Sequence, residues 1–168
     1  MTAKFPNRQR LAETTDLRLG VRNSGDEAIP DLAVTIFVDD GASGSFNIRL
    51  DQPGLANPNR PVWVLEDTYP RLVGASRPPG SSPGVVAQTN TFAFGPLDPG
   101  DEREMVWRVT PVRGGTYTVN YEIAAGLQGN ATAVTAGGSE PRGKFVVTIS
   151  TKPPKARVND AGKVEIEQ

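Results

Sequence analysis

The stretch Leu97–Ile123, LDPGDEREMVWRVTPVRGGTYTVNYEI, decides the fold because it contains two β-strands and the corner between them. Apolar residues alternate with mostly polar ones on both sides of the corner, at Met105, Trp107, Val109, Tyr117, Val119, Tyr121 and Ile123. A period of two residues is typical of a strand with one buried face. The stretch therefore predicts two strands of a β-sandwich.

The same alternation recurs in Thr15–Arg22, Asp31–Asp40, Ser45–Asp51, Thr91–Phe94 and Lys144–Ser150. Clusters of turn-forming residues close the first two of these runs. We predict an all-β fold in which one face of each strand contributes to a single core. The predicted core residues are Leu17, Leu19, Val21, Leu32, Val34, Ile36, Met105, Trp107, Val109, Tyr117, Val119, Tyr121, Ile123, Phe145, Val147 and Ile149.

The segment from about residue 52 to residue 89 is rich in Pro, Gly and Ser, and it contains one short strand-like run at Val62–Leu65. Connections of this length are uncommon in compact domains and are usually functional or disordered. We interpret the segment as a loop insertion within a sandwich domain that covers residues 1–152. The tail at residues 153–168 has the pattern of a small hairpin.

Composition excludes several classes of function. The chain has 168 residues, with 18 Lys and Arg against 19 Asp and Glu, and its formal net charge is -1. It has no overall field to attract nucleic acid or an anionic membrane surface. No apolar run reaches the about 20 residues of a membrane span, so we expect no direct membrane insertion by this segment. The sequence lacks His and Cys, the residues of most nucleophilic triads and zinc sites.

Three motifs resemble, in their order and spacing, bacterial immunoglobulin-like surface modules of the cell-adhesion-related domain type: VRNSGDEAIPDLAVTI, LDPGDEREMVWRVTP and GGTYTVNYEI. The matching positions are Asn23, Gly25, Leu97, Pro99, Gly100, Pro111, Gly115, Tyr117 and Val119. The resemblance implies an immunoglobulin-like antiparallel β-sandwich, from which the insertion and the Ala/Gly-rich segment before Lys144 depart. The chain is also similar to bacterial membrane-anchored proteins, which implies a location and no activity.

The residues of the last motif also have a physical interpretation. Gly-x-Tyr-x-Val is the pattern of a tyrosine corner, in which a Tyr at the start of a strand hydrogen-bonds to a nearby backbone group. Tyr117 is the predicted corner residue. Trp107 is predicted to fill the core volume that a disulfide occupies in antibody domains.

The insertion contains the candidate partner-contact residues Trp63, Tyr69 and Arg71. Trp, Tyr and Arg are the residue types that dominate binding hot spots, and loops often carry function. A structural interpretation competes with this one and is favoured: Trp63 and Leu65 cover an open edge or end of the sandwich. An exposed Trp would need a partner to bury it.

Acidic residues gather at Asp98, Asp101, Glu102 and Glu104, with a second pair at Asp39 and Asp40. Asp98 and Asp101 are candidate ligands of a weak calcium site. The regular spacing of a calcium-binding loop is missing, however, and Asp-Pro-Gly-Asp is a sequence that favours a turn without any metal. Glycosidase chemistry needs two facing carboxylates, which nothing in the sequence pairs. We therefore assign no catalytic, metal or cofactor-binding residue, and we expect no enzyme activity.

The predicted function is that of a non-enzymatic extracytoplasmic module for adhesion, spacing or protein–protein contact within a larger cell-surface protein. The alternative is a carbohydrate- or small-ligand-binding sandwich that uses the aromatic residues of the insertion. The partner is a protein or a glycan that the sequence does not identify. We expect a monomer in isolation, because Pro30, Pro53, Lys144, Lys152 and Lys155 have the character of residues that guard sheet edges.

Overall fold

The structure is a computed structural model that describes residues 1–38, 46–48, 61–66, 68–73, 85–88, 90–126, 133–152, 155–158 and 162–167. Every regular element in these ranges is a strand. The strands are β1 (Thr2–Lys4), β2 (Arg8–Arg10), β3 (Thr15–Arg22), β4 (Ala33–Val38), β5 (Phe46–Ile48), β6 (Trp63–Leu65), β7 (Arg71–Val73), β8 (Val85–Gln88), β9 (Thr91–Ala93), β10 (Glu102–Pro111), β11 (Gly115–Ala124), β12 (Arg142–Ser150), β13 (Lys155–Val158) and β14 (Val164–Glu167).

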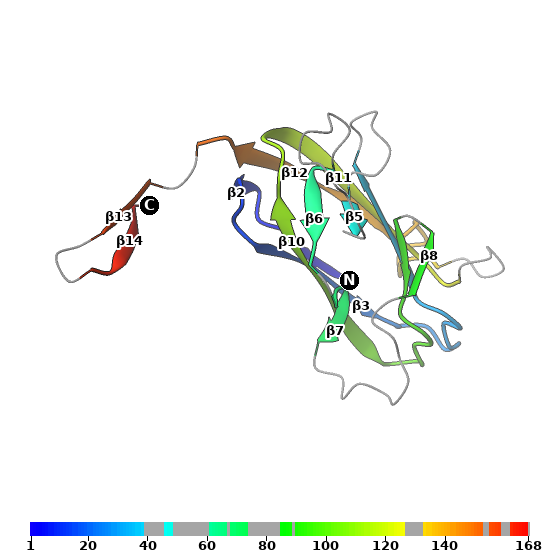
Figure 1. The fold of residues 1–168 in the computed structure, drawn as a ribbon. Coiled ribbons are helices and arrows are strands. Elements are labelled where there is room, and N and C mark those ends of the chain that lie inside the picture. The colour runs from blue at the N-terminus through cyan, green and yellow to red at the C-terminus, as the bar shows by residue number, and fades with distance from the viewer. Residues whose placement is uncertain are drawn as a thin grey trace.

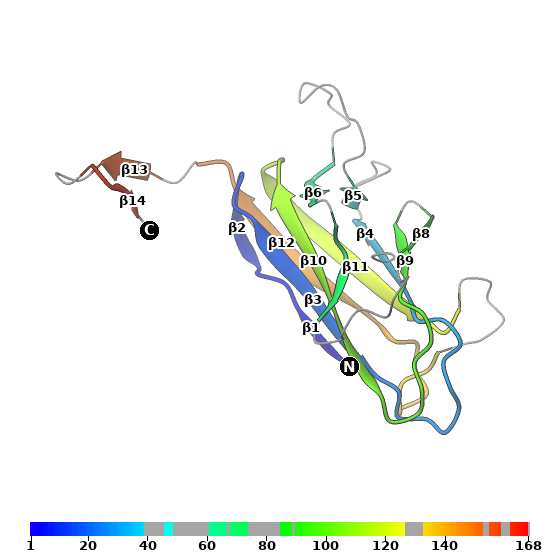
Figure 2. The same cartoon turned by 60° about the horizontal axis from the view of Figure 1, so that its bottom comes forward.

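Two sheets form a sandwich, which Figure 1 and Figure 2 show from two directions. The first sheet has the order β1-β3-β10-β6-β5, and β7 also pairs with β10. The second has the order β2-β12-β11-β4-β9-β8. Most pairs are antiparallel, while β2 with β12 and β5 with β6 are parallel. The N-terminal segment contributes a strand to each sheet, because β1 pairs with β3 and β2 pairs with β12.

The core lies between the two sheets and follows the alternation in the sequence. Trp107 and Leu17 are register partners in the first sheet, and Tyr121 and Ile36 are partners in the second. All the predicted core residues are buried except Tyr117 and Phe145, which are partly buried and pack against the core. The prediction of which face of each strand is buried is confirmed.

The insertion forms more strands than the single run that the sequence suggests. β6 and β7 pair with β10, and β8 pairs with β9. These strands are only three or four residues long, so the neighbours that supply their hydrogen bonds determine them more than any periodicity does. The insertion is therefore in part an extension of both sheets.

The first two motifs meet at one buried side chain. Asn23 follows β3, and its Nδ2 donates to the carbonyl oxygens of Glu27 at 2.8 Å and Leu97 at 3.0 Å. Its Oδ1 accepts a hydrogen bond from the N–H of Gly25 at 3.1 Å, and its own carbonyl accepts one from the N–H of Gly100 at 2.8 Å. The motif residues before β4 and before β10 thus fix two turns against each other.

The tyrosine corner is present at the start of β11. The Tyr117 hydroxyl donates a hydrogen bond to the Gly114 carbonyl oxygen at 2.9 Å. Gly115, between them, has a φ of 142°, a conformation that side chains with a Cβ rarely adopt. A Cβ there would also lie 3.0 Å from the Tyr117 hydroxyl. The Gly-x-Tyr spacing is therefore explained by the backbone it requires.

At the C-terminal end, β13 and β14 pair antiparallel in a two-stranded sheet of their own. Figure 1 shows this hairpin to one side of the two larger sheets. Among the residues that the structure describes, no helix has the length and apolar character to cross a membrane.

Candidate functional site

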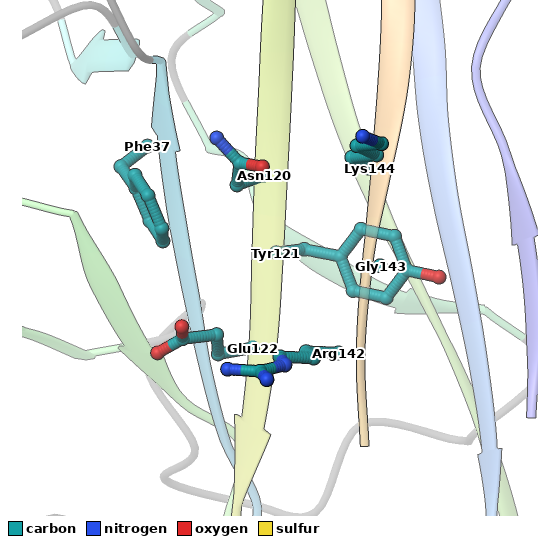
Figure 3. A pocket seen from close by; sticks show the side chains of 7 residues that line it. All are labelled: Phe37, Asn120, Tyr121, Glu122, Arg142, Gly143 and Lys144. Atoms are coloured by element: carbon teal, nitrogen blue, oxygen red, sulfur yellow. The ribbon is translucent and has the colours of Figure 1, made fainter. Parts of the chain in front are cut away.

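An open hollow of about 440 Å³ lies on the outer face of the second sheet, over β4, β11 and β12. One row of the sheet crosses it, because Phe37 on β4 and Lys144 on β12 are both register partners of Asn120 on β11. Figure 3 shows these three side chains at one level across the strands. Phe37 and Asn120 are half-buried and Lys144 is exposed. The row places an aromatic ring, an amide and a cation side by side.

The next row of the sheet adds a carboxylate and a second cation. Glu122 and Arg142 are register partners, and both are exposed and line the hollow. They lie close to each other below the first row in Figure 3. Arg142 also pairs with Glu140 at 3.1 Å. The hollow therefore presents both signs of charge on a strand platform.

Tyr121 and Gly143 complete the lining from between these rows. They are register partners, and a Cβ at position 143 would lie 2.3 Å from the Tyr121 hydroxyl. Glycine at 143 therefore allows the Tyr121 ring to extend across β12, as Figure 3 shows. Burial raises the pKa of the Tyr121 hydroxyl. Tyr121 is 6% exposed, so it contributes to the core more than to a surface that a partner touches.

The chemistry of the hollow suits recognition. A half-buried aromatic ring offers a stacking surface, the amide offers a donor and an acceptor, and the charged groups add directional hydrogen bonds. These groups lie on neighbouring strands, so the sheet holds them in place. A site of this kind can bind a partner side chain or a sugar ring.

Trp63, the first partner-contact candidate, lies in the core with no exposed surface. Its indole Nε1 donates a hydrogen bond to Oε1 of Gln9 at 2.7 Å. Its ring centroid is 5.7 Å from those of Phe5 and Tyr117. Leu65 is 2% exposed. The structure thus assigns both residues to the cover over the core, and Trp63 offers no surface for a partner.

Tyr69 and Arg71, the other two candidates, lie beside the outer face of the first sheet. Arg71 is exposed and Tyr69 half-buried. The guanidinium carbon of Arg71 is 4.5 Å from the centre of the Tyr69 ring, and that of Arg108 on β10 is 5.3 Å from it. The ring therefore already has cationic neighbours from its own chain.

Arg108 belongs to a network of charges on this outer face. Asp16 accepts hydrogen bonds from Arg108 at 2.9 Å and from Arg18 at 3.0 Å, and Arg18 also pairs with Glu104 at 3.3 Å. The hydrogen bond from Arg108, helped by Arg18, lowers the pKa of the Asp16 carboxyl although burial opposes the shift. A general acid needs the opposite shift, so Asp16 has the properties of a structural carboxylate.

The acidic cluster at the turn before β10 forms backbone contacts. The Asp101 N–H donates to the Asp98 carbonyl at 3.1 Å, and the Asn23 N–H donates to the Asp101 carbonyl at 2.9 Å. Within the part of the chain that the structure describes, no three acidic side chains come together as a metal site. Asp39 and Asp40 lie outside that part.

The sequence does not predict the hollow, although one residue indicates an unusual outer face. Phe37 stands between Ile36 and Val38, which share the core face, so it is a large aromatic residue on the opposite face of its strand. Asn120 and Glu122 are indistinguishable in sequence from the polar residues of any solvated face. Pairing of β11 with both neighbours is what brings these residues together.

Comparisons of structure agree with the sandwich. The chain is similar to the CARDB domain of the PF1109 protein from Pyrococcus furiosus, in complex with di-metal ions, at 12% identity and a TM-score of 0.50 over 89% of this chain and 90% of that one. It is also similar to BslA, a bacterial hydrophobin, at 12% identity and a TM-score of 0.43 over 86% of each chain.

Comparisons of sequence add nothing further: no family model matches the chain, and no curated protein matches it. The structural likeness at 12% identity defines the fold alone. The chain is an all-β, immunoglobulin-like sandwich of the kind found in CARDB domains.

Proposed function

We propose that the chain is a non-enzymatic immunoglobulin-like module that makes adhesive or protein–protein contacts at the cell surface, as part of a larger protein. The observation that carries this proposal is the open hollow lined by Phe37, Asn120 and Glu122, on the outer face of the second sheet. The motif residues Asn23, Gly100 and Tyr117 support turns and the corner, and none of them lines the hollow.

A non-enzymatic role agrees with the chemistry of the chain. The sequence has no His and no Cys. Asp16 has a lowered pKa and is held by two arginines, which makes it unsuitable as a general acid. The module is therefore proposed to act by binding, with no cofactor.

Glycan binding is the second candidate, and one observation favours it. The half-buried ring of Phe37 lies beside the amide of Asn120, an arrangement that suits stacking on a sugar and hydrogen bonding to its hydroxyls. This location differs from the aromatic residues of the insertion, because Trp63 is buried and the Tyr69 ring is flanked by arginines.

The direct test is a binding screen with the purified chain immobilised on beads. The probes are a panel of purified cell-surface proteins and a glycan array. We expect binding to at least one protein, and we expect Phe37→Ser combined with Glu122→Ala to abolish it. Thr116→Ala, on the same outer face but outside the hollow, is the matched control and should leave binding unchanged.

Binding that survives the double variant would contradict a role for the hollow, and binding to glycans alone would favour the second candidate.

Location is tested separately, by protease digestion of intact cells that express the full-length protein. An antibody against this segment should show cleavage without lysis. Protection until the cells are lysed would contradict the extracytoplasmic part of the proposal.

A further inference from the structure

We propose that the open edge of β12, from Arg142 to Val147, binds an extended acidic segment of a partner protein by strand addition. This inference rests on the proposed function and names the chemistry of the partner. The edge adjoins the hollow, because Arg142, Gly143 and Lys144 belong to both.

Pairing on the two sides of β12 is unequal. On one side β11 pairs with β12 from Arg142 to Ile149. On the other side β2 pairs only with Thr148, Ile149 and Ser150. In the ranges that the structure describes, no strand pairs with the second side of β12 between residues 142 and 147. This open run is twice as long as the three-residue edge strand β1.

The backbone groups of this run point in a direction that a partner strand can use. The Thr148 N–H donates to the Asn7 carbonyl at 2.9 Å, on the side away from β11. Alternate residues of a strand direct their N–H and C=O groups to the same side, so those of Lys144 and Val146 also point away from β11. Arg142 follows the same alternation, but its N–H already donates to the Glu140 carbonyl at 3.0 Å. Two residues thus offer ladder positions, and Val146 is 56% exposed.

The charges beside the edge select an acidic partner. Arg142 and Lys144 are exposed on the outer face of β12. Arg8 and Arg10 lie on the same outer face, on β2, as register partners of Thr148 and Ser150. The ion pair between Arg142 and Glu140 competes only weakly with an acidic partner for Arg142, because the two side chains are 65% and 69% exposed. An added strand would place every second side chain next to these cations.

The other face of the added strand would meet apolar residues. Phe145 points between the sheets, where its ring centroid is 5.8 Å from that of Phe5 and 5.4 Å from that of Tyr121. Val147 on the same face is buried. The fitting partner segment therefore alternates acidic and apolar side chains over about five residues.

A second copy of the chain fits this edge poorly. Antiparallel pairing of β12 with itself would bring the Arg142 and Lys144 side chains of the two copies together. Like charges across neighbouring strands are destabilising. The same cations that attract an acidic segment therefore keep the edge from pairing with itself.

The test uses the full chain and a capped synthetic hexapeptide of alternating glutamate and valine, with amide hydrogen exchange followed by NMR. Saturating peptide should slow exchange at Lys144 and Val146 at least about tenfold, because their N–H groups become hydrogen-bonded. A peptide of alternating lysine and valine, and a backbone N-methylated glutamate–valine peptide, should not slow it.

Lys144→Glu should weaken binding of the glutamate peptide about tenfold, because an attraction becomes a repulsion. Lys152→Glu makes the same charge change beyond the C-terminal end of β12. It is the matched control and should leave the affinity for the peptide within about twofold. Far-ultraviolet circular dichroism and tryptophan emission should show that both variants are folded.

Exchange at Lys144 and Val146 that stays unchanged with saturating glutamate peptide overturns the inference. Equal binding of the lysine peptide overturns the acidic preference, and so does an unchanged affinity for Lys144→Glu. If the peptide does not bind the edge but the bead screen shows binding that depends on the hollow, strand addition is excluded and the proposed function is retained. Failure of both experiments removes both.

Discussion

The side-chain amide of Asn23 donates a hydrogen bond across the fold to the carbonyl oxygen of Leu97, 3.0 Å away and shielded from water. This bond links the turn after β3 to the turn before β10. Residues 74 positions apart in the sequence are thereby held in one network. The two motifs that contain these residues therefore stabilise each other's turns.

Replacing Asn23 with Ala should destabilise the chain by about 2–4 kcal/mol, because it removes three side-chain hydrogen bonds, to the Leu97 and Glu27 carbonyls and from the Gly25 N–H. Urea denaturation measures the change in the free energy of unfolding. Asn120→Ala on the outer face is the matched control and should cost no more than about 0.5 kcal/mol. Equal effects of the two substitutions would show that the Asn23 network is unimportant.

Tyr117→Phe should reduce the free energy of unfolding by about 1 kcal/mol, the usual net contribution of one intramolecular hydrogen bond. The lost bond joins the Tyr117 hydroxyl to the Gly114 carbonyl. Tyr69→Phe removes a hydroxyl from a half-buried ring outside the corner and should have a smaller effect. A Tyr117→Phe protein as stable as the wild type would mean that its hydroxyl points to water.

Trp107→Ala should cost about 3–5 kcal/mol, because it opens a cavity in a core without disulfides. Trp107 is fully buried, and its ring centroid is 5.7 Å from that of Phe92 and 5.6 Å from that of Phe94. Guanidinium denaturation gives the value. A loss below about 1 kcal/mol would place Trp107 on the surface and invert the face assignment of β10.

The emission of Trp63 tests whether the insertion contains a stacking platform. In a Trp107→Phe background Trp63 is the sole tryptophan, and its burial predicts blue-shifted emission that iodide does not quench. A glycan panel should leave the spectrum unchanged. Red-shifted emission that responds to a glycan would restore Trp63 as a contact residue.

Asp16→Asn should flatten the acid side of the stability profile. The pKa of Asp16 is lowered in the folded state, so its stabilising effect is complete above the unfolded pKa of about 3.9 and is lost as pH falls through the folded pKa. The wild type should exceed the variant by up to about 1 kcal/mol at pH 7, and the difference should vanish toward pH 2. A difference that is constant with pH would exclude the ion pairs as its source.

The sequence predicts the strands that are themselves long, and it misses short strands whose partners decide their structure. β3, β10 and β11 alternate over eight to ten residues, so their period alone identifies the buried face. β7 has three residues and no such period, and it forms because β10 supplies the ladder. Phe92 is fully buried in a three-residue strand, and Leu97 is fully buried in an isolated bridge with Ile29. The predicted core lacks both residues because runs this short have no clear period.

The sequence does not predict the candidate site, for a related reason. Phe37, Asn120 and Lys144 are far apart in the chain and meet only because β11 pairs with β4 and β12 in one register. Trp63 was a reasonable candidate by residue type, but its hydrogen bond to Gln9 and its ring neighbours place it in the core. Residue type alone does not distinguish a contact residue from a core residue.

Amide exchange in the free protein tests the central claim most directly, which is that β12 presents an open edge beside the hollow. NMR should show fast exchange at Lys144 and Val146, whose N–H groups point away from β11. Exchange should be slow at Phe145 and Val147, whose N–H groups bond to β11. Slow exchange at all four positions would show that the edge is already covered, and would contradict the account.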